Sequence, residues 1–312
     1  MRLLLDALAP GTVDTYQAGF EAYAKFCGVS GARFPPSSGE LLAFATHQHQ
    51  GGLSRSRVQR LVLGVRNACV ESGESLTPFA DPRLARLYLG MDRQEGAARP
   101  RPREPAGKAP FTPELLSRAI RDLGGDRVKD RALQAALALA FFGLLRAGEV
   151  TFKPERRVAP LTRKSVAWHP DHVEITLHAT KTDRRRRGVV VKFFPSGGRV
   201  CPYTLLRCAW DRSPVVGPEA AVLQADDDGR PLSYRDLLDC VKQCVARAGL
   251  NVAAYGTHSL RAGGASLMAQ RGFGDLDVRA MGRWSSTCFQ RYIRFGNEFH
   301  QNVARELGAA MQ

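Results

Sequence analysis

The segment His258-Ser259-Leu260-Arg261 is followed by Gly282-Arg283-Trp284 and then by Tyr292, and this stretch decides how the chain is interpreted. On a helix, His258 and Arg261 lie three positions apart and share one face, so both side chains can reach the same anion. Arginine grips phosphate through a planar charged fork, and histidine exchanges protons near neutral pH. Trp284 adds an indole N–H donor. The stretch therefore suits phosphate binding, with Tyr292 as the nucleophile.

Two basic residues upstream extend this set. Arg146 ends an apolar run, residues 135–145, that predicts a buried helix, and Glu149 is the acidic partner that a buried arginine needs. An Arg–Glu pair of this kind can also be purely structural. Lys181 begins the polar turn 181–188 between two predicted strands. Thr257 is the expected N-cap of the helix that starts at His258, and the positive end of that helix favours a bound phosphate.

In order and spacing this set resembles the tyrosine recombinases, also called phage-type integrases, over the C-terminal two thirds of the chain; the resemblance is carried by Arg146, Lys181, His258, Arg261, Trp284 and Tyr292. One feature departs from the pattern. Tyr292 follows Trp284 by eight positions, whereas bacterial members usually have nine. The forms Gly282-Arg283-Trp284 and Cys201-Pro202 are more similar to recombinases of eukaryotic mobile elements, the DIRS-like retrotransposons and Cryptons.

The resemblance implies a reaction and a role for each residue. Tyr292 would attack the scissile phosphate and form a 3′-phosphotyrosine with a free 5′-hydroxyl. Arg146 and Arg261 would hold the phosphate, and Lys181 would protonate the leaving oxygen. His258 would accept the Tyr292 proton or donate a second hydrogen bond. Trp284 would complete the cradle and Glu149 would support Arg146, with no metal and no other cofactor.

Composition points to a nucleic-acid partner. The formal charge is +15, from 45 Lys plus Arg against 30 Asp plus Glu, and such an excess favours a polyanion through counterion release. Nucleic acid is therefore the leading partner, and the resemblance implies double-stranded DNA; solubility alone is the alternative explanation of the charge. The longest apolar run, 135–145, is shorter than the roughly 20 residues of a membrane span, so no membrane partner is expected.

Cysteine and histidine patterns give no reason to expect a disulfide framework or a metal site. The seven cysteines are odd in number and scattered, as in a protein of a reducing compartment. The pairs His47/His49 and His169/His172 lack a matching second pair of ligands. Residues 226–229 read as a turn rather than an acidic metal site.

The predicted fold class is α+β, mainly α with a small β-sheet. Residues 1–95 form several short helices with a Ser37–Glu40 capping box, as in a helical core-binding DNA-binding domain. Residues 96–110 are a basic, proline-rich linker, and residues 111–312 are the catalytic domain with strands near 172–178 and 189–194. A last helix near 297–311 is expected to support a tetramer on DNA or to pack on its own domain.

Two basic segments are candidate DNA contacts. One is the linker with Arg99, Arg101 and Arg103, for which a solvated spacer is the alternative; the other is the run Arg184, Arg185, Arg186 and Arg187, for which a solvated turn or a nuclear localisation patch is the alternative. Three other functions compete with recombination. They are a catalytically silent DNA-binding protein derived from a mobile element, a type IB topoisomerase, and an unrelated basic RNA-binding or structural protein. The expected location is the nucleus if the eukaryotic resemblance holds, and otherwise the cytoplasm or nucleoid.

Overall fold

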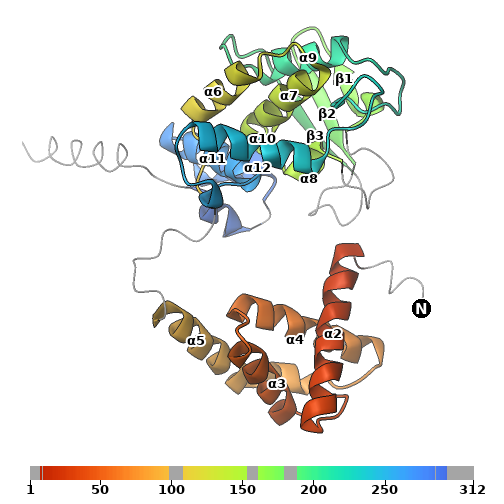
Figure 1. Cartoon of the computed structure of the whole chain (residues 1–312), viewed down its shortest axis with the longest axis vertical. Helices are drawn as coiled ribbons and strands as arrows, with labels where there is room; N and C mark the ends of the chain where they lie inside the picture. The colour runs from red at the N-terminus through yellow and green to blue at the C-terminus, as the bar shows by residue number, and fades with distance from the viewer. Residues whose placement is uncertain are drawn as a thin grey trace, which may run out of the picture. The chain divides into compact units, whose positions relative to one another are not determined.

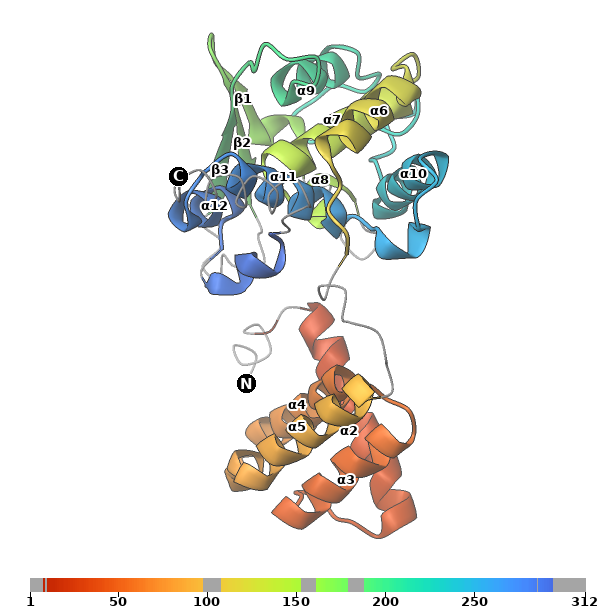
Figure 2. The same cartoon turned by 90° about the vertical axis from the view of Figure 1, so that its left-hand side faces the viewer.

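The chain folds into two units, Met1–Glu104 and Pro105–Gln312. The computed structural model describes residues 8, 10–97, 108–152, 161–178, 188–284 and 286–293 (Figures 1 and 2). Three predicted segments lie outside the described residues: the linker arginines, the turn that carries Lys181, and the helix expected near 297–311. None of the described helices is long and apolar enough to cross a membrane.

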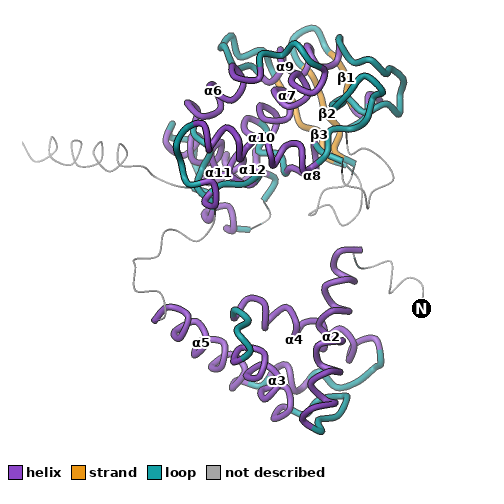
Figure 3. Tube along the Cα trace, in the orientation of Figure 1, coloured by secondary structure: helices purple, strands orange, loops and turns teal. Residues whose placement is uncertain are grey.

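The first unit is helical throughout its described part (Figure 3), with α2 (Pro10–Ser30), α3 (Ser38–Gln50), α4 (Arg55–Glu71), the 3-10 turn η1 (Thr77–Ala80) and α5 (Pro82–Ala97). The predicted capping box at the start of α3 is confirmed, because Ser37 Oγ accepts from Glu40 N and the Glu40 carboxylate accepts from Ser37 N. The core is aromatic, and the rings of Tyr23, Phe26 and Phe44 contact one another. Burying each such ring contributes about 2 to 3 kcal/mol.

The second unit is built around α7 (Val128–Phe142), which packs against α6 (Pro113–Leu123), α9 (Pro202–Asp211), α10 (Tyr234–Arg247) and α11 (His258–Gln270). Almost every residue of α7 from Ala132 to Phe141 is buried, as expected for a helix that is apolar all round. Thr112 caps α6, and Pro113 occupies the first position of that helix.

A three-stranded antiparallel sheet completes the second unit in the order β1 (Val166–Trp168), β2 (Val173–Leu177) and β3 (Val189–Phe193). On β2, buried residues alternate with half-buried ones, so one face of the strand packs on the core. The short strand β1 and helix α12 (Asp275–Gly282) were not among the predicted elements. The predicted α+β class, mainly α with a small sheet, is confirmed.

Two adjacent glycines allow α11 to approach its neighbours closely. A Cβ on Gly263 would collide with the carbonyl oxygen of Phe111, and one on Gly264 would collide with that of Phe141. Any larger residue would push α11 away from the end of α7. Because Arg261 lies less than one turn before this contact, the glycines place its side chain beside the residues that follow α7.

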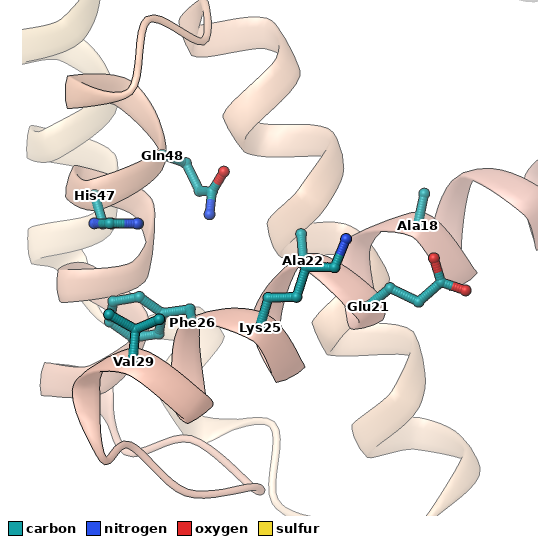
Figure 4. A pocket seen from close by; sticks show the side chains of 8 residues that line it. All are labelled: Ala18, Glu21, Ala22, Lys25, Phe26, Val29, His47 and Gln48. Atoms are coloured by element: carbon teal, nitrogen blue, oxygen red, sulfur yellow. The ribbon is translucent and has the colours of Figure 1, made fainter.

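Figure 4 shows a hollow in the first unit between α2 and α3, lined by Ala18, Glu21, Ala22, Lys25, Phe26, Val29, His47 and Gln48. Its lining combines apolar side chains with one lysine and one glutamate. The hollow contains none of the residues that the sequence singles out for phosphate chemistry. The candidate site therefore has to be sought in the second unit.

Candidate active site

The site begins where α7 ends. After Gly143 the backbone of Leu144 adopts φ 47°, a left-handed conformation that costs a non-glycine residue about 1 kcal/mol or more. Arg146 then becomes the N-cap of the short helix α8 (Ala147–Val150). Glu149 folds back on it: Oε2 accepts from Arg146 N at 2.8 Å and Oε1 accepts from Arg146 Nη1 at 2.8 Å. The predicted pairing of Arg146 with Glu149 is confirmed.

The unusual backbone at Leu144 presents its carbonyl oxygen to two guanidinium groups. Arg261 Nη1 donates to Leu144 O, and Arg261 Nη2 donates to Gly282 O at 2.5 Å. Arg283 Nη2 donates to Leu144 O at 3.2 Å, and its Nη1 donates to Gly143 O at 3.0 Å. The two arginines thus join the turn after α7 to the end of α12.

Glu149 is the centre of this network. Its side chain is 6% exposed, and its Oε2 also accepts from Arg283 Nη2 at 3.2 Å. Two guanidinium groups bond to this carboxylate, and that of Arg261 interacts with it electrostatically, so the three arginines leave an excess of positive charge. Burial, with repulsion from Arg146 and Arg283, lowers the pKa of Arg261 to about 9. An anion at this position would relieve that repulsion.

Aromatic side chains cover Arg261. The Trp284 ring lies 4.1 Å from Arg261 Cζ, within cation–π range, and the Tyr292 ring lies 5.9 Å from the same atom. Tyr292 packs against Trp284 with ring centroids 5.3 Å apart, and its centroid is 6.4 Å from that of His258. A Cβ on Gly282 would collide with the Trp284 ring, which explains the glycine in Gly282-Arg283-Trp284. The 3-10 turn η4 (Thr287–Arg291) leads directly into Tyr292.

The structure brings together most of the residues that the sequence predicts, namely Arg146, Glu149, His258, Arg261, Trp284 and Tyr292. Their exposure differs: His258 is exposed and the Arg146 side chain is 22% exposed, whereas Arg261 is 1% exposed. Arg261 is thus covered in this conformation, while Arg146 and His258 face solvent.

The side-chain cap expected at Thr257 is not formed. Thr257 does precede α11, but its side chain makes no capping hydrogen bond; instead its hydroxyl donates to Tyr234 Oη at 3.3 Å, and its backbone is already helical. The described residues do not include the basic side chains predicted in the turn and in the linker, namely Lys181, Arg184, Arg185, Arg186, Arg187, Arg99, Arg101 and Arg103.

Arg283 was missed as a site residue, although the sequence contained a signal for it. Arg283 lies nine positions before Tyr292, which is the spacing usual in the bacterial enzymes that the sequence resembles. Its backbone is left-handed, with φ 56°, and its side chain is 11% exposed. Burial lowers the pKa of Arg283, and Glu149 opposes that change. Trp284, one position later, instead packs on Arg261.

The fold is that of solved tyrosine recombinases. XerH site-specific recombinase bound to a palindromic difH substrate matches with a TM-score of 0.62 and 15% identity, over 95% of this chain and 78% of that one. A lambda integrase dimer bound to a COC′ core site matches with a TM-score of 0.60 and 14% identity, over 92% of this chain and 89% of that one. The Tn1549 transposon integrase in complex with transposon right end DNA matches with a TM-score of 0.57 and 15% identity, over 95% of this chain and 99% of that one.

A comparison of sequences also finds a recombinase relative. An integrase/recombinase xerD homolog of Selenomonas ruminantium is 22% identical over 316 residues, which is 98% of this chain and 88% of the relative. No family model matches the sequence. Together with the motif carried by the arginine network and Tyr292, these similarities support assignment of the chain to the tyrosine recombinase/integrase superfamily.

Proposed function

We propose that the protein is a site-specific DNA recombinase or integrase that cuts and rejoins double-stranded DNA through a phosphotyrosine on Tyr292. One observation carries the proposal: Tyr292 packs beside a buried guanidinium network that is short of negative charge. A scissile phosphate would supply that charge. The same group would then lie next to a tyrosine hydroxyl and an exposed histidine.

In the proposed reaction the phenolic oxygen of Tyr292 bonds to phosphorus while the bond to the 5′ oxygen breaks. The phenolic proton passes to His258, and Lys181 gives a proton to the leaving 5′ oxygen. Attack by a second 5′-hydroxyl reverses these steps and rejoins the strand. The arginines supply the positive charge that magnesium provides in other phosphoryl transfers, so neither metal nor nucleotide is required.

Arg283 belongs to the proposed phosphate cradle in place of Trp284. It stands at the family spacing from Tyr292, and Glu149 holds its guanidinium in the same network as that of Arg146. Trp284 then acts indirectly, as the apolar cover that packs on Arg261. Arg283 would donate to the phosphate through its fork, as histidine or tryptophan does in the resembling family.

Access to Arg261 requires a movement of its cover. Because Arg261 is 1% exposed and its guanidinium lies under Trp284 and Tyr292, a phosphate can touch that group only when these rings shift. Arg146, which is partly exposed, would make the first contact. Binding of DNA would therefore precede alignment of Tyr292.

Double-stranded DNA is the proposed partner, and a tetramer on DNA is the proposed assembly. The DNA-bound recombinases that share the fold support the first proposal. In the first unit, Arg57 and Arg60 are exposed and three positions apart on α4, where they can follow a phosphate backbone. Arg99, Arg101 and Arg103 and the run Arg184–Arg187 are further proposed contacts.

A finer assignment, to recombinases of eukaryotic DIRS-like or Crypton elements, rests among the described residues on Gly282-Arg283-Trp284 and Cys201-Pro202. It would place the protein in the nucleus. A bacterial affiliation would place it in the cytoplasm or nucleoid.

Covalent trapping tests the proposed function. The protein is incubated in EDTA with a library of nicked duplexes and denatured in SDS, and the attached DNA is sequenced. We expect adducts with wild type and none with Tyr292→Phe, while Tyr255→Phe, a change of another partly buried tyrosine in the same unit, keeps them. DNA retained only before denaturation would favour a silent DNA-binding protein, and supercoil relaxation without partner exchange would favour a topoisomerase.

A further inference from the structure

A second group of functional side chains lies at the turn between β1 and β2. His169 and His172 flank this turn, and His169 N donates to His172 O at 2.9 Å to close it. The two imidazole rings are stacked, with centroids 4.4 Å apart and planes 6° from parallel. The turn therefore holds two potential metal ligands side by side.

Glu174 provides the third group. It lies two positions after His172 on β2, so both side chains project from the same face of the strand. Glu174 Oε1 is 3.3 Å from His172 Nε2, and Glu174 Oε2 is 3.6 Å from His169 Nε2. Ligand atoms of the three residues all lie within 4.8 Å of one another. Both imidazoles thus direct Nε2 toward one carboxylate.

We propose that His169, His172 and Glu174 form a binding site for a divalent transition-metal ion of the zinc class. Tetrahedral zinc with Zn–N and Zn–O bonds near 2.0 to 2.2 Å separates its ligand atoms by roughly 3.3 Å. The two nitrogen–oxygen distances are already close to that value. Binding requires the stacked rings to tilt so that their lone pairs converge, and it leaves a fourth position for water.

The surroundings of His172 match those of a metal ligand. His172 Nδ1 is 2.6 Å from Asp171 Oδ1, so Nδ1–H can donate to this carboxylate, while Nε2, which faces Glu174, would give up its proton when a metal ion binds. Such a partner orients the ring toward the metal. A competitor is also present, because Lys192 Nζ lies 2.7 Å from Glu174 Oε1. Lys192 is 53% exposed, so it can swing into solvent when a metal binds Glu174.

The proposed metal is separate from the proposed chemistry. Val173, next to His172, begins β2, whereas Leu177 pairs with Val189 at its other end, where the chain leads toward Lys181. A bound ion would cross-link the β1–β2 turn and stiffen the sheet that carries this segment. Strand transfer itself would not pass through the ion.

Metal titration tests the proposal without any reference to recombination. The full-length protein is stripped with EDTA, dialysed and titrated with zinc against a chromophoric chelator. A His169→Ala/His172→Ala double variant should lose one equivalent of bound zinc, and the matched His47→Ala/His49→Ala pair should keep it. Asp171→Asn should weaken binding about 10-fold, the effect typical of a lost outer-shell partner. Lys192→Gln should strengthen binding, because it removes the competing cation.

Cobalt identifies the ligands. We expect the Co²⁺ form of the wild type to show visible absorption of a nitrogen- and oxygen-ligated ion without a sulfur-to-cobalt band, and the double variant to lose it. Circular dichroism of the double variant verifies that it is folded. Equal zinc binding by wild type and the folded double variant, or a cobalt spectrum dominated by cysteine sulfur, would overturn the proposed site.

Discussion

The interiors of the two units differ in one respect that points to the site. In the described part of the first unit, the buried residues are apolar or aromatic, as around Phe44, whereas Glu149 and Arg261 are buried in the second. Burying charge is costly unless partners compensate it. The first unit therefore has an interior that serves packing, and the second keeps a costly charged network beside Tyr292. Buried charge that packing does not require marks the place where chemistry is expected.

The largest effect should come from the apolar interior. Phe44 is 0% exposed and contacts two other rings, so Phe44→Ala should cost about 3 to 5 kcal/mol. Hydrogen exchange should accelerate in peptides of α2 to α4 and stay unchanged in α7. Val29→Ala, at an 83% exposed position, is the control and should change little. Equal acceleration in α7 would show that the units do not unfold separately.

The charged interior should be nearly as sensitive. Glu149→Gln leaves Arg283 buried without its carboxylate and should destabilise the second unit by about 3 kcal/mol. The control is Glu219→Gln, because Glu219 pairs with Lys164 at side-chain exposures of 66% and 51% and should contribute less than about 1 kcal/mol. Chemical denaturation with fluorescence detection measures both. Similar losses of unfolding free energy for the two variants would contradict the claim that the buried network contributes more stability than an exposed ion pair does.

A smaller change should separate chemistry from stability. Arg283→Lys keeps a positive charge near Glu149 but loses the planar fork, so strand cleavage of a nicked substrate should slow about 100-fold. The melting temperature should change much less. Arg235→Lys, at a 90% exposed side chain on α10, should leave both unchanged. Normal cleavage by Arg283→Lys would remove Arg283 from the cradle.

The smallest expected effect is on the stability of the two units at acidic pH. Each unit contains a helix cap in which a carboxylate takes part. The pKa of Asp236 is lowered: burial opposes the shift, but hydrogen bonds from Lys129 and Ser233 outweigh it. A lowered carboxyl pKa gives stability that is present above the unfolded value of about 3.9 and is lost as pH falls. Asp236→Asn should therefore flatten the loss of stability of the second unit below about pH 4. In the first unit, Glu40→Gln should do the same, because Ser37 lowers the Glu40 pKa.

Local sequence signals predicted most of the fold. The Ser37–Glu40 capping box and the strand near residues 172–178 each depend on signals within a few residues, and each is present in the structure. Strand β1 was missed because three residues are too few to show alternation. The turn at 226–229 was predicted correctly, with Gly229 at φ 79°.

The arrangement of the site was less accessible to prediction. The residue types of the site and their order could be identified from the sequence. The hydrogen bond from Arg261 to Leu144 O could not, because it spans 117 positions and depends on the left-handed backbone of Leu144. The contact between Glu174 and His169 could not be predicted either, because it follows from the closed turn between β1 and β2. Contacts that need tertiary structure leave no periodic trace in the sequence. For Arg283, the spacing from Tyr292 was the signal in the sequence that pointed to its place in the network.

The most direct test of the central claim is to identify the amino acid that carries the DNA. Trapped adducts formed in EDTA are digested with nuclease and protease, and the modified peptide is sequenced by mass spectrometry. We predict a nucleotide linked through its 3′-phosphate to the oxygen of Tyr292. A nucleotide on another residue, a 5′ linkage, or adducts that form only with added metal would contradict the account.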